Sequence, residues 1–186
     1  MPRYPRLQFP DAFYHVTSRG SRGEPIFEDA VACRRFLSVL LEAQRRCGWR
    51  CFAYCLMTNH YHLVLMTPEP NIAQGMQHLN GMYARWFNRR HGLEGHLFQR
   101  RYHTAMIESD WHLLEACRYV VLNPVRAGLV AAPEEWTWSS YRATVRPSGE
   151  TAIAVDELLK FFGREADAAR RAFEGFVADV PERRPF

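Results

Sequence analysis

The stretch NHYHLVLM, residues 59–66, is an apolar run with strand-forming residues that carries two histidines, His60 and His62. Successive side chains of a strand point to opposite faces, so both imidazoles project from one face while Tyr61 and Leu63 project from the other. Two imidazoles side by side suit one divalent ion, with open positions for a substrate oxygen. A pair of histidines on an uncovered sheet face, without a metal, is the alternative interpretation of this pattern.

The segments around this stretch alternate between strand and helix patterns. Strands are predicted over 12–20, 49–57, 60–66 and 97–108, and helices over 28–48 and 71–92. The order β-α-β-β-α-β is that of the ferredoxin-like arrangement, an α+β class with an antiparallel sheet. A further helix is expected after the fourth strand, with Ser109 as its N-cap and its end forced by Pro124.

This last helix is predicted to be amphipathic. At 100° per residue one stripe is polar and comprises His112, Glu115, Tyr119 and Asn123. Apolar residues, among them Leu113, Cys117 and Val120, occupy the opposite side. Tyr119 could act as a nucleophile beside a positive neighbour or a metal-polarised phosphate, which a phenol with an ordinary pKa of about 10 requires. The alternative interpretation is that Tyr119 is an ordinary surface tyrosine on an amphipathic helix.

Composition restricts the class of protein. A chain of 186 residues with 47% hydrophobic residues can bury one substantial core. No apolar run approaches the roughly 18 residues that a membrane span requires, and the N-terminal residues lack the apolar region of a signal peptide. A cytoplasmic location without membrane association is therefore expected. The odd number of cysteines, five, favours reduced thiols over a disulfide framework.

The basic residues are nearly all arginines and gather in the first two thirds of the chain. Up to residue 130 there are 16 basic and 10 acidic residues, whereas beyond it there are 8 and 10. Guanidinium groups pair with phosphates, and aromatic rings stack on unpaired bases. Residues 83–103 carry both kinds of side chain. The expected DNA-binding set is Arg19, Arg85, Arg89, Arg90, Arg100, Arg101 and His103.

Five motifs in order resemble one known family. They are YHVTSRG (14–20), LMTNHYHLVL (56–65), GHLFQRRY (95–102), YVVLNPVRAGLV (119–130) and WTWSSYRA (136–143). The chain thereby resembles the REP-associated tyrosine transposases, single-tyrosine members of the HUH endonuclease superfamily. The resemblance implies that His60 and His62 are paired ligands of Mg²⁺ or Mn²⁺, that Asn123 is the third ligand and that Tyr119 is the nucleophile.

The same resemblance implies an activity and a substrate. The protein would bind single-stranded hairpin DNA, in particular repetitive extragenic palindromes, and cleave it through a 5′-phosphotyrosine intermediate. It also implies a nucleoid-associated protein and favours a monomer. Cleavage is expected to fade below about pH 6, because a protonated imidazole cannot bind a metal. The family's usual Arg-Gly-Asn after the first strand is here SRGSRGEPIF (18–27), a departure that bears on DNA specificity.

Two other functions are compatible with these residues. A metal-dependent nuclease could use activated water and form no covalent adduct. A regulatory nucleic-acid-binding protein derived from a transposase could keep the fold without turnover. The expected organisation is a catalytic domain over 1–145, followed by a linker and a helical extension over 146–186 that packs on the core. Within this extension the residues 146–151 have linker composition.

Overall fold

The computed structural model describes residues 8–146 and 152–179. Its strands are β1 (Ala12–Arg19), β2 (Arg50–Leu56), β3 (His60–Thr67) and β4 (His103–Ile107). The helices that pack on the sheet are α1 (Ala30–Cys47), α2 (Ile72–His91) and α3 (Asp110–Val121). Shorter helices follow: α4 (Asn123–Arg126), α5 (Tyr141–Val145), α6 (Val155–Leu159) and α7 (Ala166–Ala178). Two single turns of 3-10 helix lie at Ser21–Gly23 and Pro133–Glu135.

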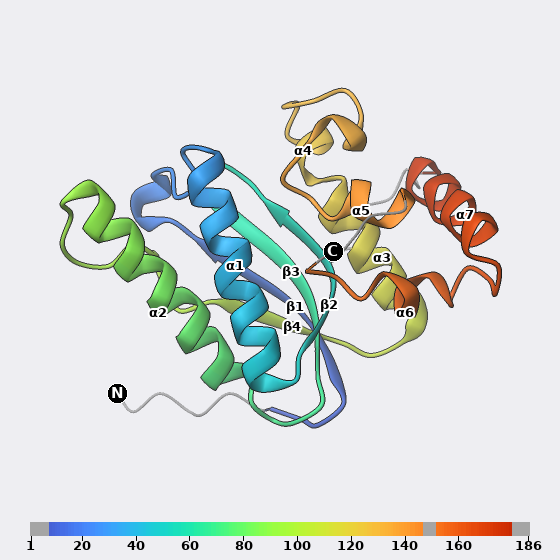
Figure 1. Cartoon of the computed structure of the whole chain (residues 1–186), viewed down its shortest axis with the longest axis horizontal. Coiled ribbons are helices and arrows are strands. Elements are labelled where there is room, and N and C mark those ends of the chain that lie inside the picture. Colours follow the sequence, from blue (N-terminus) through green and yellow to red (C-terminus); the bar gives the residue numbers. More distant parts are fainter. Residues whose placement is uncertain (1–7, 147–151, 180–186) are drawn as a thin grey trace.

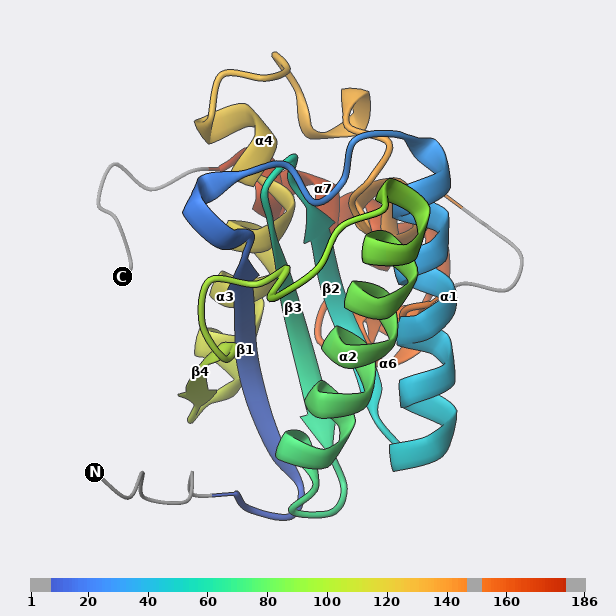
Figure 2. The ribbon, with the colours of Figure 1, turned by 90° about the vertical axis from the view of Figure 1, so that its left-hand side faces the viewer.

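The four strands form one antiparallel sheet in the order β2-β3-β1-β4. Helices α1 and α2 cover one face of this sheet, and α3 lies on the other (Figure 1, Figure 2). Each face has its own apolar core. Tyr61, Leu63 and Leu65 of β3 point towards α1 and α2, while Val64 and Met66 belong to the core that includes α3. The ferredoxin-like α+β prediction is therefore confirmed.

The predicted ends of the helices follow from local chemistry. The Asp29 side chain accepts a hydrogen bond from the Ala32 backbone N–H, which caps the start of α1. Gly48, with φ 69°, ends α1 in the left-handed conformation that glycine tolerates. Ser109 caps α3 through its hydroxyl, as predicted, and α3 ends at Val121 before Pro124. Pro124 then lies in the first turn of α4, where proline lacks only an N–H that would have no helical partner.

The prediction of a fourth strand over 97–108 is wrong at its start. Regular pairing with β1 covers only His103–Ile107, and the preceding residues make a single bridge between Phe98 and Gly20. Gln99, Arg100 and Arg101 are exposed polar residues that interrupt the strand pattern. The chain therefore bends away between the bridge and β4, and both arginines face solvent.

The segment after α4 covers the outer edge of β2. Leu56 N–H donates to the Trp138 carbonyl, and Ser140 N–H donates to the Tyr54 carbonyl. The Trp136 indole N–H also donates to the Leu56 carbonyl at 3.0 Å. This explains the WTWSSYRA motif as a cover for an edge strand, which would otherwise present unpaired backbone groups.

Helices α5, α6 and α7 continue the core on the α3 side of the sheet. Leu158, Phe173 and Val177 are buried there with Phe52 of β2. Most of the predicted linker, residues 147–151, lies outside the described residues, and the boundary at residue 145 stays a prediction. Among the residues that the structure describes, no helix has the length and apolar character of a membrane span.

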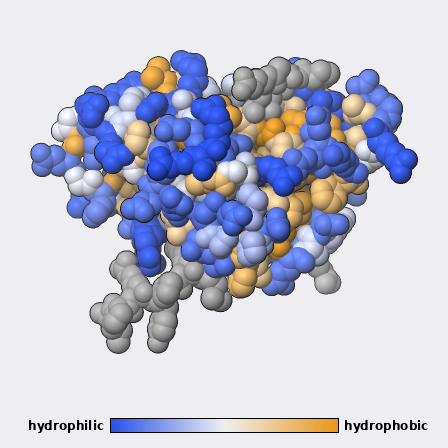
Figure 3. Space-filling view, turned by 60° about the horizontal axis from the view of Figure 1, so that its bottom comes forward, coloured by the Kyte–Doolittle hydropathy of each residue, from blue (hydrophilic) through white to orange (hydrophobic). Residues whose placement is uncertain are grey.

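Two kinds of surface meet on the face shown in Figure 3. The half on the side of α2 is mainly hydrophilic, whereas apolar surface gathers on the half of α6 and α7. A shallow pocket with an apolar lining lies among Phe13, Phe52 and Phe161, with Glu157 and Lys160 at its border. The surface of α6 and α7 is thus more apolar than the surface on the side of α2, which carries arginines.

Candidate active site

The pairing of β1 with β3 gathers histidines on the sheet face that carries α3. His60 lies opposite Arg19 and His62 lies opposite Thr17, so these four side chains share one face. His15, two residues before Thr17, projects from the same face. The predicted common orientation of His60 and His62 is present, with their ring centroids 5.1 Å apart.

Each of the two predicted metal ligands has its Nδ1 atom in a side-chain contact. The Nδ1 of His60 lies 2.8 Å from the Asn59 side-chain oxygen, so this nitrogen carries the proton that it donates. The Nδ1 of His62 lies 3.0 Å from the Nε2 of His15. In both rings the nitrogen that remains for a metal is Nε2, a common ligand atom in proteins.

Burial keeps these imidazoles neutral. It lowers the pKa of His62 to about 3, and the neighbouring His15 and His60 add to this effect. Burial also lowers the pKa of His15 to about 4 and moves the pKa of His60 in the same direction. Since free histidine has a pKa near 6.5, burial acts against the protonation that would prevent these imidazoles from binding a metal. The loss of cleavage below about pH 6 stays a prediction.

Tyr119 lies on α3 next to these histidines. Its ring centroid is 5.7 Å from that of His15 and 5.7 Å from that of His62, in edge-on arrangements. The guanidinium of Arg126, on α4, lies over the Tyr119 ring at 4.9 Å. A cation over the ring favours negative charge on the phenol oxygen during attack. The predicted nucleophile and the predicted ligand pair are thus neighbours.

Asn123 is the first residue of α4 and lies one helical turn beyond Tyr119. Its side-chain N–H donates to the Tyr119 carbonyl at 2.9 Å, which fixes the amide by its nitrogen. The amide oxygen is a hard donor of the kind that Mg²⁺ and Mn²⁺ accept, and imidazole also suits Mn²⁺. The donor chemistry of His60, His62 and Asn123 therefore fits a divalent cation.

One part of the polar stripe on α3 is not available to a substrate. Glu115 and Arg118 are only 6% and 3% exposed, and they form an ion pair with each other. Arg118 also donates to the carbonyls of Phe176 and Asp179 and lies over the Phe176 ring. The expectation of a continuous polar face is wrong at Glu115, because α7 covers this side of α3.

The loop after β1 is fixed beside His60 by the turn between β2 and β3. Asn59 accepts the Gly20 N–H at its carbonyl and donates from its side chain to the Gly23 carbonyl. A Cβ atom on Gly20 would lie 2.3 Å from the Glu24 carbonyl oxygen, so this position requires glycine. The departure from the family's usual Arg-Gly-Asn thus lies in a loop that contacts the site directly.

The predicted DNA-binding residues divide into two groups. Arg19 is exposed at the end of β1, Arg100 and Arg101 are exposed in the segment before β4, and His103 is exposed on β4, where it shares the face of His15 and His62. The Gln99 N–H donates to the Arg19 carbonyl at 2.9 Å, which joins the two arginine-bearing segments. Arg85 and Arg89 are exposed on α2, across the sheet from α3.

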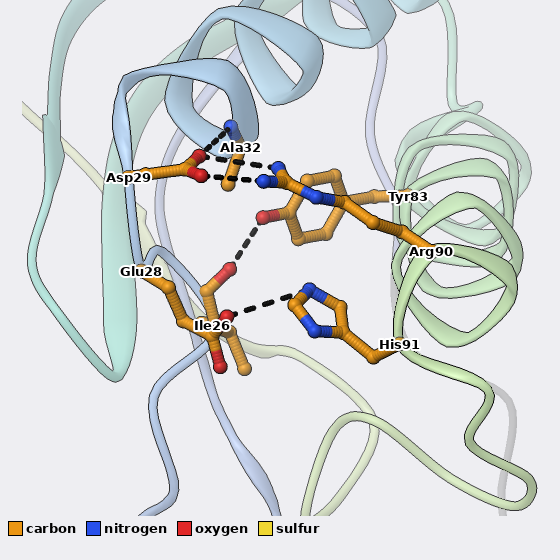
Figure 4. A network of polar contacts seen from close by, with 7 residues as sticks. All are labelled: Ile26, Glu28, Asp29, Ala32, Tyr83, Arg90 and His91. Carbon is orange, nitrogen blue, oxygen red and sulfur yellow. Dashed lines mark hydrogen bonds and ion pairs between the residues drawn. The ribbon is translucent and has the colours of Figure 1, made fainter.

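Arg90, the last member of the predicted set, has a partner within the protein. Its guanidinium donates to both carboxylate oxygens of Asp29, at 3.1 and 2.5 Å (Figure 4). The same figure shows the Tyr83 hydroxyl bonded to the Ile26 carbonyl and His91 paired with Glu28. These contacts join the end of α2 to the start of α1. Arg90 therefore has a structural role that the sequence did not indicate.

Three residues of the site were missed in the sequence. His15 and Asn59 contact the two candidate ligands, and Arg126 lies over Tyr119. The alternation of β1 could have placed His15 on the face of Thr17 and Arg19. Its contact with His62 depends on the register between β1 and β3, which strand patterns alone do not give.

Comparisons with known proteins identify the family and the fold of this chain. The family model described as "Transposase IS200 like" matches residues 8–123. A protein of Haemophilus influenzae with a provisional assignment as a REP-associated tyrosine transposase is 29% identical over 105 residues. That alignment covers 50% of this chain and 60% of the relative, so the chain matches less than two thirds of the relative's length.

A solved structure described as a REP-associated tyrosine transposase bound to a REP hairpin has a similar fold. The TM-score is 0.66 at 17% sequence identity, and the match covers 81% of this chain and 93% of the other. At this identity the likeness establishes the arrangement of helices and strands. The roles of individual residues depend on the geometry described above.

Proposed function

Because the chain belongs to the IS200-like transposase family, we propose that it cleaves single-stranded hairpin DNA and transfers the strand, with Tyr119 as the nucleophile. The observation that carries the proposal is the position of the Tyr119 ring, 5.7 Å from the His62 ring. A phenol beside neutral imidazoles that can hold a cation suits transesterification at a phosphate.

In the proposed reaction the Tyr119 hydroxyl oxygen attacks the scissile phosphorus. A bond forms between this oxygen and phosphorus as the bond from phosphorus to the 3′ oxygen breaks. The phenol proton is transferred overall to the leaving oxygen, which gives a 5′-phosphotyrosine and a 3′-hydroxyl. The energy of the phosphodiester is retained, so another 3′-hydroxyl can displace Tyr119 and join two strands.

His60, His62 and Asn123 would hold Mg²⁺ or Mn²⁺ in this reaction. When bound, such an ion polarises the phosphate oxygens and stabilises their developing charge. The chain itself holds the two imidazoles by Asn59 and His15 and keeps them neutral by burial. Arg126 lies over the Tyr119 ring, where its positive charge would favour negative charge on the phenol.

The proposed substrate is a DNA hairpin of the repetitive extragenic palindrome class. The solved relative is described as bound to such a hairpin, which supports this choice. Arg19, Arg100 and Arg101 are exposed beside the loop that is bonded to Asn59, and they are the proposed phosphate contacts. Binding to chromosomal repeats would make the protein nucleoid-associated.

The test is formation of a covalent adduct. A labelled single-stranded hairpin incubated with protein and Mg²⁺ should give a product that survives SDS and disappears after protease digestion. Tyr119→Phe should lower its formation by at least about 10³-fold, since removal of a nucleophile removes the covalent step. Tyr102→Phe is the matched control and should keep the adduct, because Tyr102 is buried on another segment.

The other outcomes identify the alternative functions. Cleavage by the wild type without any adduct would favour the nuclease that uses water. Hairpin binding without cleavage, in either metal, would favour the regulatory protein. An adduct that persists in Tyr119→Phe and maps to another tyrosine would refute the assignment of the nucleophile.

A metal requirement is tested separately. Excess EDTA should abolish adduct formation, and His62→Ala should do so without loss of hairpin binding. Asn123→Ala should slow adduct formation by about tenfold and leave it measurable, because water can replace a neutral amide ligand. Full activity in EDTA would refute the proposed role of all three residues.

A further inference from the structure

His15, on β1, contacts His62 of the proposed ligand pair through a ring nitrogen. Its Nε2 lies 3.0 Å from the Nδ1 of His62, and the two ring planes are inclined by only 20°. A nearly coplanar arrangement at this distance is that of a hydrogen bond between two ring nitrogens. One of these nitrogens must donate and the other must accept.

The direction of this bond follows from the use of the other ring nitrogen. If His62 offers the lone pair of Nε2 to a cation, its proton must lie on Nδ1. Nδ1 then donates, and His15 accepts at Nε2 with its own proton on Nδ1. His60 has the same arrangement, since its Nδ1 donates to the Asn59 oxygen. Both candidate ligands would thus present Nε2 because a neighbour holds Nδ1.

We propose that His15 is a positioning residue for His62: it accepts the Nδ1 proton and so fixes the tautomer and the ring plane in which His62 presents Nε2. The inference rests on the proposed metal-dependent function, which supplies the reason for this tautomer. Partners of this kind orient metal-binding histidines in many proteins.

A role of His15 as a direct ligand fits the geometry less well. The lone pair of its Nε2 points to the His62 ring, so it is not directed at an ion bound to the Nε2 of His62. Over residues 8–146 and 152–179, no group of three or more histidine, cysteine or acidic side chains has the geometry of a metal site. A role as a base for Tyr119, whose ring is 5.7 Å away, is the other alternative.

Three variants separate these roles. His15→Phe keeps a planar ring and removes the acceptor, whereas His15→Gln keeps an acceptor oxygen on a flexible chain. Thr17→Val is the matched control, because Thr17 lies directly opposite His62 on the same face, whereas the side-chain contact of the His62 Nδ1 is with His15. Thermal unfolding of each variant confirms that it folds before it is compared.

The first measurement is the affinity for Mn²⁺ by titration calorimetry without DNA. His15→Phe should weaken it by about 10- to 100-fold, the usual effect of losing such a partner. His15→Gln should stay within about fivefold of the wild type, and Thr17→Val should not change it. An unchanged affinity in His15→Phe would overturn the proposal. Complete loss in both His15 variants, as in His62→Ala, would also overturn it and make His15 a ligand.

The second measurement is the tautomer of His62 by ¹⁵N NMR of the metal-free protein. The wild type and His15→Gln should have the proton on Nδ1, whereas His15→Phe should give a mixture of both tautomers. A His62 that carries its proton on Nε2 in the wild type would overturn the proposal. The proposal would also be overturned if His15→Phe kept the wild-type tautomer of His62 and the wild-type Mn²⁺ affinity but formed the adduct slowly. That result is expected if His15 acts as a base for Tyr119.

Failure of the proposed function would give results different from failure of the role proposed for His15. A wild type that forms no adduct and binds no Mn²⁺ would refute the metal-dependent reaction. The tautomer measurement would then still report whether His15 accepts the proton of His62. The two proposals can therefore fail separately.

Discussion

Tyr61 and His62 are neighbours in β3, yet their side chains have very different surroundings. Tyr61 is fully buried beneath α1 and α2, with the Phe36 ring 4.6 Å away and its hydroxyl bonded to Asn80. His62 faces α3, which packs on β2 and β3 and leaves the β1 side of that face to polar residues. One face of the sheet is closed by two helices, and the other holds the candidate site where α3 meets the strands.

The comparison suggests that stability and chemistry are separated by the alternation of a strand. Two helices on one face supply apolar burial, so the opposite face can hold a cluster of imidazoles at low cost to the fold. Substitutions at adjacent positions of β3 should therefore affect different properties.

Tyr61→Ala should lower the free energy of unfolding by about 3–5 kcal/mol, because it removes a large side chain from a packed core. His60→Ala, one position away and partly exposed, should change it by no more than about 1 kcal/mol. Urea unfolding measures both. The two variants should differ in the opposite sense in adduct formation, because His60→Ala should lose the adduct.

Tyr61→Phe makes this comparison sharper, since it removes only the hydroxyl bonded to Asn80. It should cost about 1 kcal/mol and keep adduct formation. Loss of adduct formation in Tyr61→Phe with normal unfolding would contradict the separation of the two faces.

Arg118→Met should lower the free energy of unfolding by about 3–5 kcal/mol, because Glu115 would remain as a buried charge without its partner. The double variant Glu115→Leu with Arg118→Met should recover most of this loss. Urea unfolding of the single and double variants gives the coupling energy. A single variant as stable as the wild type would show that the α3 face has no structural role at this point.

The free energy of unfolding should fall as the pH decreases from about 6.5. The pKa of His62 is about 3 in the folded protein and near 6.5 in the unfolded chain, so the unfolded state binds more protons between these values. This one group contributes at most about 1.4 kcal/mol per pH unit, and the contribution is complete at neutral pH. Urea unfolding in EDTA at several pH values should show a smaller slope in His62→Asn. Equal slopes would mean that His62 is not held neutral by the fold.

Arg100→Ala combined with Arg101→Ala should lower the slope of log affinity against log salt by about 1.4, since each contact with single-stranded DNA contributes about 0.7. Arg90→Ala serves as the control, because Arg90 is paired with Asp29 on the other face of the sheet. Its slope should not change. Fluorescence anisotropy with a labelled hairpin measures both. An effect limited to Arg90 would place the DNA on the α1 and α2 face.

Much of the fold could be predicted because its signals are local. The caps at Ser109 and Gly48 and the alternation around His60 depend on residues next to each other in the chain. The ring contact of Tyr119 with His62 joins residues that are 57 positions apart, and only the resemblance to a family indicated it. The start of β4 was wrong because its pairing with β1 is set by the bend after Phe98.

The environments of Glu115 and His15 could not be predicted, because both depend on contacts between residues far apart in the sequence. Glu115 is buried by α7, whose contacts with Arg118 join residues about 60 positions apart. His15 contacts His62 through a strand register that a shift of one residue would abolish. Contacts of this kind depend on the whole arrangement of elements and leave no pattern in a short window of sequence.

The anchoring of α7 by Arg118 has a consequence for how proteins of this kind could be divided. The match to the family model ends at residue 123, but Arg118, inside that limit, is bonded to the carbonyls of Phe176 and Asp179. A chain shortened to the region of similarity would leave a guanidinium without these acceptors, directly before the candidate nucleophile in sequence. The end of the matched family model and the end of the unit that folds together therefore differ here, and α7 is part of the smallest piece expected to fold with an intact Tyr119.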